Sequence, residues 1–274
     1  MLNSLEIAST YPKSLLNAGT GFLSGYTHTL NPYAGCTFGC SYCYVRQMPV
    51  ALFRGAEWGM WVDVKEGAAD VLLKQLRKAK AKGPVTIFMS SSTDPYQPIE
   101  YKARVTRSLL EAMVVEPPAF MLVQTRSPLV RRDMDLLQRF GDRVRVSMTI
   151  ETDLEPIRKA FTPYAPPIAA RLQTLRSLRD AGIPTQAAVA PVLPSSEYFA
   201  ATLRQVVDRV VVDDYYMGDG SGGRRTQRMD LQAKYRELGV ESWYRPTAYR
   251  LVYERLQQHF SNDRLFISQA GFEP

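Results

Sequence analysis

All three cysteines of this 274-residue chain lie within eight consecutive positions, in the segment Gly35-Cys36-Thr37-Phe38-Gly39-Cys40-Ser41-Tyr42-Cys43-Tyr44. A segment this short cannot distribute three thiols over a fold, but it can bring them to one centre. Gly35 and Gly39 favour such a loop because glycine adopts positive φ angles without a penalty from a Cβ atom. Thiolates are the ligands of iron–sulfur clusters and of zinc. On a cluster of four irons, Cys36, Cys40 and Cys43 leave one iron open, as catalytic metal sites do for their substrates.

The main alternative is a structural zinc site completed by His28 or His259, the two histidines of the chain. Zinc fingers and ribbons usually space their ligands more widely, so the pattern favours a cluster. A disulfide with a spare thiol is less favoured, because the cysteines are crowded and residues 1–16 are too polar for a secretory signal. We expect His28 to have a structural role within a strand.

The spacing Cys-x3-Cys-x2-Cys, with Tyr42 before the last cysteine, resembles the signature of radical S-adenosylmethionine (SAM) enzymes. In that family the open iron binds the amino and carboxylate groups of SAM. The reduced cluster then cleaves SAM to a 5′-deoxyadenosyl radical, which abstracts hydrogen from the substrate. The segments 31–36 and 92–98 are similar to the spore photoproduct lyase-like branch, and the likeness extends from about residue 28 to about residue 189. The resemblance implies a 4Fe–4S cluster on the three cysteines and SAM as the second cofactor.

The composition is typical of a globular protein, with 45% hydrophobic and 22% charged residues. No run of residues approaches the roughly 20 apolar positions of a membrane helix, so we expect no membrane association. Free thiols and an oxygen-sensitive cluster fit a reducing cytoplasm. The net charge of +7 is spread along the sequence, and it leaves nucleic-acid binding open.

Alternating strand and helix patterns predict an α/β fold. We expect strands at 26–33, 85–89, 120–125, 143–150, 185–192 and 209–213, helices at 65–82, 104–116, 129–140, 166–181 and 197–207, and a covering segment at 48–61. Because βαβ units wind one way, this alternation predicts a parallel, partly closed barrel. That agrees with the partial (β/α)6 TIM-type barrel of the resembled family. A doubly wound open sheet is the alternative.

We predict three parts of the chain: an irregular leader at 1–25, a radical SAM core at 26–214, and a C-terminal extension at 215–274 that packs on the core. In the extension we expect a helix at 244–259 and a strand at 265–268. The glycine-rich segment 218–223 is typical of a mobile linker. The alternative is a substrate lid whose arginines meet phosphate, although the segment lacks the ending of a nucleotide P-loop.

The resemblance places SAM against the loops that follow the strands. Ser91, Ser92 and Asp94 follow the second strand and offer oxygen atoms to the ammonium group of SAM, or else form a turn and cap the next helix. Arg126 follows the third strand, where its planar fork would suit the carboxylate of SAM. Tyr42, inside the cysteine loop, is a further residue that the resemblance places at the cofactors.

Ser147, Thr149 and Glu151 stand at the end of the fourth strand, which faces the site in a barrel. They are candidates to contact the methionine moiety or the ribose of SAM. We expect alternation to turn only some of these side chains inward, and among them we select Glu151.

The net reaction does not follow from the sequence. Spore photoproduct lyase uses a further cysteine as hydrogen-atom donor near the end of the second strand, where this chain has Ser91 and no cysteine outside the loop. An O–H bond is a poorer hydrogen-atom donor than an S–H bond, so we do not expect repair of that photoproduct. Tyr42, Tyr44 or Tyr96 could relay a radical, although most tyrosines serve in packing. Ser91 and Tyr96 are therefore the catalytic candidates that remain.

These observations predict a radical SAM enzyme that abstracts hydrogen from an unassigned substrate, with nucleic acid as one candidate. The expected partner is an external electron donor of the flavodoxin or ferredoxin kind. The rival prediction is a zinc-stabilised nucleic-acid-binding module without catalysis.

Overall fold

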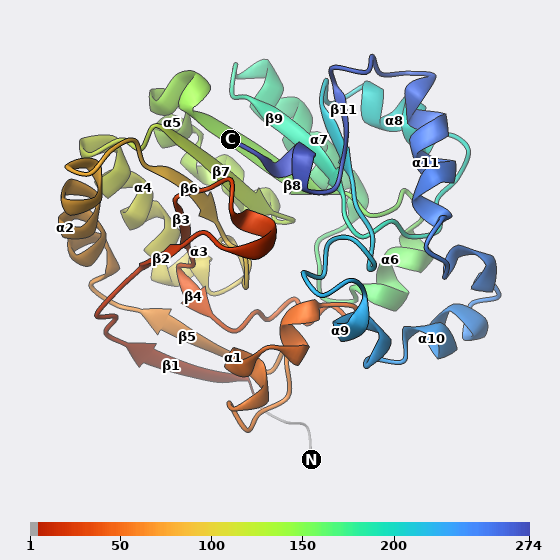
Figure 1. The fold of residues 1–274 in the computed structure, drawn as a ribbon, viewed down its shortest axis with the longest axis horizontal. Helices are drawn as coiled ribbons and strands as arrows, with labels where there is room; N and C mark the ends of the chain where they lie inside the picture. The colour runs from red at the N-terminus through yellow and green to blue at the C-terminus, as the bar shows by residue number, and fades with distance from the viewer. Residues whose placement is uncertain (1–4) are drawn as a thin grey trace.

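A parallel sheet forms the centre of the computed structural model, which describes residues 5–274 (Figure 1). Its strands stand in the order β11-β10-β9-β8-β7-β6-β3-β2, and β2 at one edge is antiparallel to β3. The strands are β2 (Leu16–Ala18), β3 (His28–Leu30), β6 (Thr86–Met89), β7 (Phe120–Thr125), β8 (Val144–Thr149), β9 (Thr185–Val189), β10 (Val210–Val212) and β11 (Leu265–Ile267). From β3 to β11 every neighbouring pair is parallel. The predicted α/β fold with a parallel sheet is therefore confirmed.

Helices pack on one face of this sheet. Successive side chains of a strand point to opposite faces, so Ile87 and Met89 of β6 and Met121 and Val123 of β7 are buried against the helices. The helices that share this core are α2 (Ala68–Lys80), α4 (Val105–Val115), α5 (Met134–Leu137), α7 (Ile168–Asp180), α8 (Phe199–Arg204) and α11 (Ala248–Gln257). A doubly wound sheet carries helices on both faces. Here the second face lines a cavity, as in a partial barrel.

Apolar side chains cover part of the second face of the sheet. Phe88, Leu122 and Val211 point inward from three strands and pack with Phe272, which lies in the short helix α12 (Gln269–Phe272). The hydroxyl of Tyr26, just before β3, donates a hydrogen bond of 2.5 Å to the carbonyl oxygen of Phe272. This contact joins the β3 side of the sheet to the side of the edge strand β11. It leaves the carboxyl ends of the strands as the open side of the barrel.

The prediction of an irregular leader is wrong for the part of the leader that the structure describes; residues 1–4 lie outside the described residues. Strand β1 (Glu6–Thr10) pairs in parallel with β5 (Trp61–Lys65), and β5 pairs with β4 (Tyr33–Ala34). The side chains of β1 are mostly exposed, so the sequence carries no alternation that would indicate a strand. The boundaries at 25/26 and 214/215 stay a prediction.

Short elements connect the main ones. They are α1 (Pro49–Leu52), α3 (Glu100–Ala103), α6 (Glu155–Phe161), α9 (Arg224–Gln227) and α10 (Leu231–Glu237), with 3-10 helices η1 (Gly21–Leu23), η2 (Tyr44–Gln47), η3 (Pro128–Asp133), η4 (Gln138–Arg143) and η5 (Glu241–Trp243). The helix predicted at 129–140 is thus η3, α5 and η4 in succession. Gly141 has a φ of 57° and interrupts its end. Within residues 5–274, no helix combines the length and apolarity needed to cross a membrane.

Candidate active site

A cavity of about 510 Å³ lies between the carboxyl ends of the strands and the cysteine loop. All three cysteines line it, together with Thr149 at the end of β8 and residues that follow β6, β7, β9 and β10. The lining also includes residues that the sequence did not point to: Phe22, Trp58, Gln124, Pro191, Asp213, Asp214, Tyr215 and Thr226. One chamber therefore brings the metal-ligand candidates together with most of the SAM-binding candidates, which come from separate loops.

Gln97 holds the cysteine loop against the loop after β6. Its Oε1 accepts a hydrogen bond of 2.9 Å from the backbone N–H of Thr37, and its Nε2 donates one of 3.1 Å to the carbonyl oxygen of Gly35. Thr93 donates a further bond of 2.6 Å to the same carbonyl. Gln97 is fully buried. The sequence marked the segment 92–98 as a resemblance, but it did not reveal that Gln97 anchors the cysteines.

The other side of the loop is fixed by Arg46 and by a close backbone approach. Arg46 donates to the carbonyl oxygens of Gly39, at 2.7 Å, and Cys40, at 3.0 Å. Gly35 has a φ of 80°, and a Cβ atom at this position would lie 2.4 Å from the carbonyl oxygen of Trp61. Only glycine fits there without a rearrangement. The loop is therefore shaped by its glycines, as its sequence suggested.

The cysteines are free thiols in a low-polarity environment. Cys36 and Cys40 are buried and Cys43 is partly exposed. Burial raises the pKa of the Cys36 and Cys40 thiols, and it raises the pKa of Cys43 to about 11. A thiolate is the form that binds metal, so positive charge from bound iron must offset this burial. The site suits a ligand that carries its own cationic charge.

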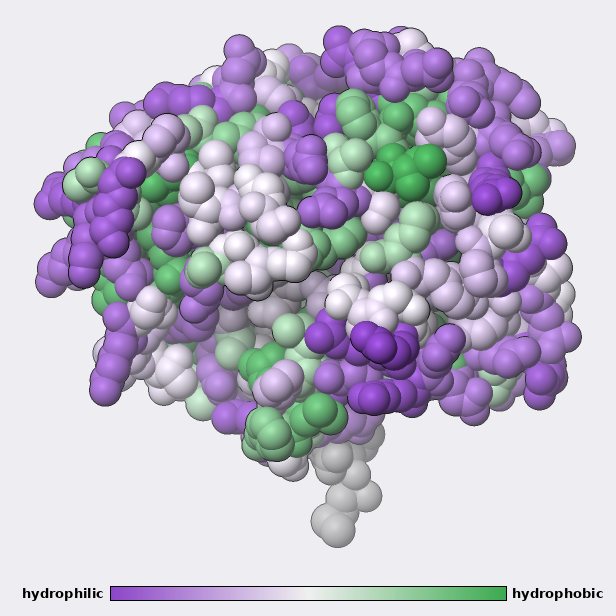
Figure 2. All heavy atoms as spheres, in the orientation of Figure 1, coloured by the Kyte–Doolittle hydropathy of each residue, from purple (hydrophilic) through white to green (hydrophobic). Residues whose placement is uncertain are grey.

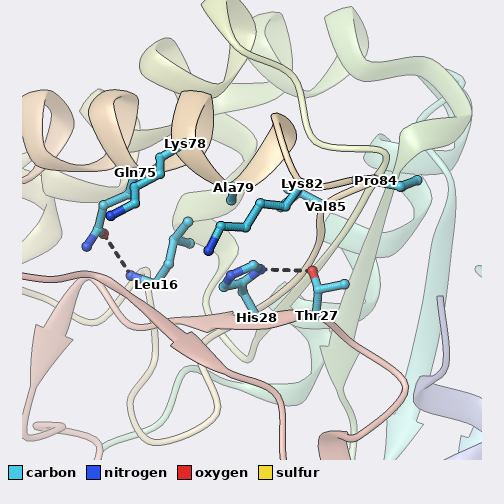
Figure 3. Close-up of a pocket in the computed structure, with 10 residues that line it drawn as sticks. Leu16, Thr27, His28, Gln75, Lys78, Ala79, Lys82, Pro84 and Val85 are labelled. Carbon is cyan, nitrogen blue, oxygen red and sulfur yellow. Dashed lines mark hydrogen bonds between the residues drawn. The ribbon is translucent and has the colours of Figure 1, made fainter.

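His28, one of the two histidines that could complete a zinc site, lies outside the cavity that the cysteines line. Within residues 5–274, no group of three or more His, Cys, Asp or Glu side chains is arranged to hold a single metal ion. Figure 3 shows His28 in a groove between β3 and α2, where a ring nitrogen lies 2.9 Å from the hydroxyl oxygen of Thr27. His28 begins β3, whereas the cysteine loop follows that strand. A 4Fe–4S cluster does not require its three cysteines to surround a single ion, because each cysteine binds a different iron.

Asp94 ties the loop after β6 to the end of β7. Its Oδ1 accepts hydrogen bonds from the backbone N–H of Tyr96, at 2.9 Å, and from the hydroxyl of Thr125, at 2.7 Å. Its Oδ2 accepts one of 2.8 Å from the backbone N–H of Arg126. The structure thus shows Asp94 as a structural link within the cavity wall. Its role toward the ammonium group of SAM stays a prediction.

The serines after β6 lie on the same wall. The hydroxyl of Ser91 accepts a hydrogen bond of 3.2 Å from Asn31, whose own side-chain oxygen accepts one of 3.0 Å from the backbone N–H of Ser92. Tyr44 donates to the carbonyl oxygen of Ser91. Tyr96, in contrast, is buried in the main core and does not line the cavity. Ser91 is therefore placed at the site and Tyr96 is not.

Glu151 lies at the centre of a buried ionic network. One carboxylate oxygen accepts hydrogen bonds from Tyr42 and, at 2.7 Å, from Arg126; the other accepts one of 2.7 Å from Arg171. Burial opposes the charge of Glu151, but the two arginines outweigh it and lower its pKa to about 2. Arg126, predicted to meet the carboxylate of SAM, is engaged here with Glu151. Arg171 was missed, because an arginine inside a helix usually lies on its exposed face.

The expectation that alternation would turn only some of Ser147, Thr149 and Glu151 inward is wrong. These residues are two apart, so a period of two places all of them on one face. Ser147 accepts a hydrogen bond of 3.0 Å from Gln186, deeper in the barrel, and Thr149 accepts one of 2.7 Å from Gln124. Thr149 lines the cavity and Ser147 does not.

The glycine-rich segment 218–223, expected to be a mobile linker, forms a hydrogen-bonded turn in the cavity wall. The carboxylate of Asp219 accepts hydrogen bonds from the backbone N–H groups of Ser221, at 2.7 Å, Gly223, at 2.9 Å, and Arg225, at 3.1 Å. Burial opposes the charge of Asp219, but these bonds prevail and lower its pKa. The sequence signal was present as an aspartate within a run of turn residues.

Three buried acceptor atoms around the cavity have no hydrogen-bond partner among residues 5–274. They are the Oγ of Ser90, the Oε1 of Gln124 and the Oδ2 of Asp214, and each belongs to a residue that lines the chamber. Buried polar atoms are normally hydrogen-bonded, so unpaired acceptors indicate a ligand that supplies N–H or O–H groups. Asp213 lies beside Asp214, and its burial raises its pKa to about 7.

Comparisons with known proteins address the same residues. The sequence model of the Radical SAM superfamily matches residues 30–206. An uncharacterized protein of Methanocaldococcus jannaschii is 32% identical over 194 residues, which cover 71% of this chain and 70% of that protein. A radical SAM Nalpha-GlyT isomerase of Pseudomonas phage M6 is 29% identical over 165 residues, which cover 60% of this chain and 32% of that protein.

The fold is also known among solved structures. A spore photoproduct lyase complexed with dinucleoside spore photoproduct aligns with a TM-score of 0.65 and 14% identity, covering 96% of this chain and 81% of that one. At this level of identity the likeness shows the fold alone. It extends beyond the family match, over the C-terminal residues that complete the cavity wall.

Proposed function

This chain belongs to the radical SAM superfamily, and on that premise we propose that Cys36, Cys40 and Cys43 hold a 4Fe–4S cluster and that SAM binds beside it in the cavity. The protein is a radical SAM enzyme. The observation that carries the proposal is the shared chamber, in which the three cysteines and the loops after four strands line one space.

The residues of the chamber fit both cofactors. The cysteines are free thiols and belong to a loop whose backbone is fixed from two sides by Gln97 and Arg46. The unpaired acceptors of Ser90, Gln124 and Asp214 suit the ammonium, hydroxyl and amino groups of SAM. When bound, the cluster and SAM supply a 5′-deoxyadenosyl radical for hydrogen abstraction.

The protein's part in this chemistry is to position the two cofactors and to exclude water. The apolar cluster of Phe88, Leu122 and Phe272 keeps water out of the part of the chamber that it borders. Tyr42 packs within the cysteine loop's apolar cluster and donates to Glu151, which fixes the ring next to Cys43. Arg126 holds one donor toward Glu151 and lines the cavity, where its charge suits the carboxylate of SAM.

We extend the proposal to a substrate derived from nucleic acid. A solved structure with the same fold supports it: a spore photoproduct lyase complexed with dinucleoside spore photoproduct. The net charge of +7 suits a polyanion. Repair of that photoproduct is not proposed, because this chain has no cysteine outside the loop to return a hydrogen atom.

Anaerobic reconstitution with iron and sulfide tests the cofactor assignment. We expect about four irons and four sulfides per chain, a brown protein, and formation of 5′-deoxyadenosine from SAM after reduction. One tightly bound zinc ion in a colourless protein, with no cleavage of SAM, would show that the assignment is wrong. Transfer of deuterium from labelled nucleosides or oligonucleotides into 5′-deoxyadenosine tests the substrate class.

A further inference from the structure

The segment from Met48 to Phe53 has one face on the cysteine loop and one face toward solvent. Met48 and Ala51 pack against the apolar cluster that contains Cys36 and Cys40. On the outer side Val50 is 39% exposed, Leu52 56% and Phe53 86%. Figure 2 shows this region as a green area at the foot of the molecule, where Figure 1 places α1. On this side of the molecule a single short helix therefore covers the apolar cluster that contains Cys36 and Cys40.

Arginines without acidic partners lie beside this apolar surface. Helix α9 contacts η2, the element that connects the cysteine loop to α1, so α9 and α1 flank the same segment (Figure 1). Arg224 and Arg228 are exposed, and neither forms an ion pair within residues 5–274. The two surfaces together combine an apolar centre with a cationic edge. We call Val50, Leu52, Phe53, Arg224 and Arg228 the loop-side surface.

Large exposed apolar side chains next to unpaired charge indicate an interaction surface. Outside this segment, Leu5 and Ile7 are exposed at β1, and others such as Val115 at the end of α4 stand singly and need no explanation. The aliphatic side chains of Val50 and Leu52 beside Phe53 offer no stacking face to nucleic-acid bases, and they favour a protein partner. The arginines favour a partner with an acidic surface.

We propose that the loop-side surface docks a small acidic redox protein, carrying a flavin or an iron–sulfur centre, that delivers the electron for SAM cleavage. This inference rests on the proposed function. Each cleavage oxidises the donor by one electron; the bond between the sulfonium sulfur and the 5′ carbon breaks, giving methionine and the 5′-deoxyadenosyl radical. All three cysteines lie in the one loop, so the chain has no second cysteine-held centre to store electrons. A partner docked on the outer face of α1 lies one short helix away from the apolar cluster that contains Cys36 and Cys40.

The experiment compares two reductants on the anaerobically reconstituted holoenzyme. Dithionite is small and needs no docking surface, whereas flavodoxin, kept reduced by its NADPH-dependent reductase, must bind. In Phe53→Asp and in the double variant Arg224→Glu/Arg228→Glu, we expect the KM for flavodoxin to rise about tenfold or more, as for loss of a central interface contact. SAM cleavage with dithionite should stay within about twofold of the native rate in both variants, because none of these residues lines the cavity.

Matched controls separate the surface from general effects. Val115→Asp introduces the same charge at another exposed apolar position, and Arg139→Glu reverses charge at an exposed arginine of η4. Both should keep the native KM for flavodoxin. Rising ionic strength should raise that KM in the native enzyme and less so in the arginine variant.

Several results would overturn the inference. One is an unchanged KM for flavodoxin in both surface variants; another is a native enzyme that accepts electrons from dithionite but from neither flavodoxin nor a ferredoxin. If Phe53→Asp instead converts a dimer into monomers, or if the arginine variant loses only oligonucleotide affinity, the surface serves a second copy or nucleic acid. Failure of cleavage with dithionite itself would refute the proposed function and not this surface.

Discussion

Glu151 and Arg171 form an ion pair with almost no contact with water: the Nη1 of Arg171 lies 2.7 Å from the Oε2 of Glu151, and both side chains are buried. Arg171 comes from the first turn of α7 and Glu151 from just beyond β8. The other carboxylate oxygen of Glu151 reaches Arg126 and Tyr42 in the cavity wall. The pair therefore connects the helix layer to the cysteine loop through one carboxylate.

Replacing Glu151 by Gln should destabilise the protein at neutral pH by about 3–5 kcal/mol, because Arg171 is left as an uncompensated buried charge. The pKa of Glu151 is lowered from 4.5 to about 2. A lowered carboxyl pKa adds stability that is complete above pH 4.5 and is lost as the pH falls toward 2. Urea unfolding of native and variant proteins should therefore show a gap that narrows from pH 5 to pH 2. An equal gap at both pH values would contradict this, and Glu197→Gln, at an exposed carboxylate, is the control.

Replacing Cys40 by Ala should abolish both the cluster and SAM cleavage while the chain still folds, because two cysteines cannot hold the cubane in the proposed way. Iron analysis, the visible absorption spectrum and the yield of 5′-deoxyadenosine measure the outcome. Ser41→Ala is the neighbouring control, since the Ser41 hydroxyl has no hydrogen-bond partner among the described residues. Survival of the cluster or of the cleavage in Cys40→Ala would refute the ligand assignment.

Replacing Gln97 by Leu should loosen the cysteine loop, because the backbone N–H of Thr37 loses its partner and the carbonyl of Gly35 loses one of two. We expect a loss of about 1–3 kcal/mol in unfolding free energy and less iron after reconstitution. Gln75→Leu is a matched control: Gln75 accepts hydrogen bonds from the backbone of Leu15 and Leu16, far from the cysteines. It should lower stability without lowering iron content. Equal iron content in the two variants would show that Gln97 does not position the ligands.

Replacing Asp219 by Ala should unfold the turn at 218–223 locally, because at least three backbone N–H groups lose their acceptor. Limited proteolysis should then cut the variant faster between 218 and 228 than the native protein. The iron content should stay native, since Asp219 does not touch the cysteine loop's anchors. Asp230→Ala, at an exposed position outside this network, should show native proteolysis. An unchanged digestion rate in Asp219→Ala would mean that the turn does not depend on this carboxylate.

The cysteine loop and the succession of strands could be predicted because each has a strong local signal. Cysteine spacing fixes the candidate ligands, and the apolar runs around Ile87, Leu122 and Val211 are long enough to mark buried strands. Strand β1 could not be predicted, since its side chains face water and its partner β5 is more than 50 residues away.

The hydrogen bonds between polar residues of the site could not be predicted from the sequence, for a related reason. Gln97, Arg171 and Asp219 make their contacts with residues that are brought together only by the fold, or with backbone groups that carry no sequence signature. In a sequence, each resembles an ordinary surface residue. Propensity and periodicity describe which face of an element is apolar, but they do not report which buried polar atom finds which partner.

The contact between Tyr26 and Phe272 has a consequence for biosynthesis. The two residues stand 246 positions apart, yet the floor of the reaction chamber is complete only when both are present. While the ribosome is still adding α11 or β11, the cysteine loop and every strand through β10 are already synthesised. The side of the chamber that Phe272 covers is then still open. Iron that reaches the cysteines during synthesis would enter a chamber still open to water. The chamber closes on that side only when Phe272 packs against Phe88 and Tyr26.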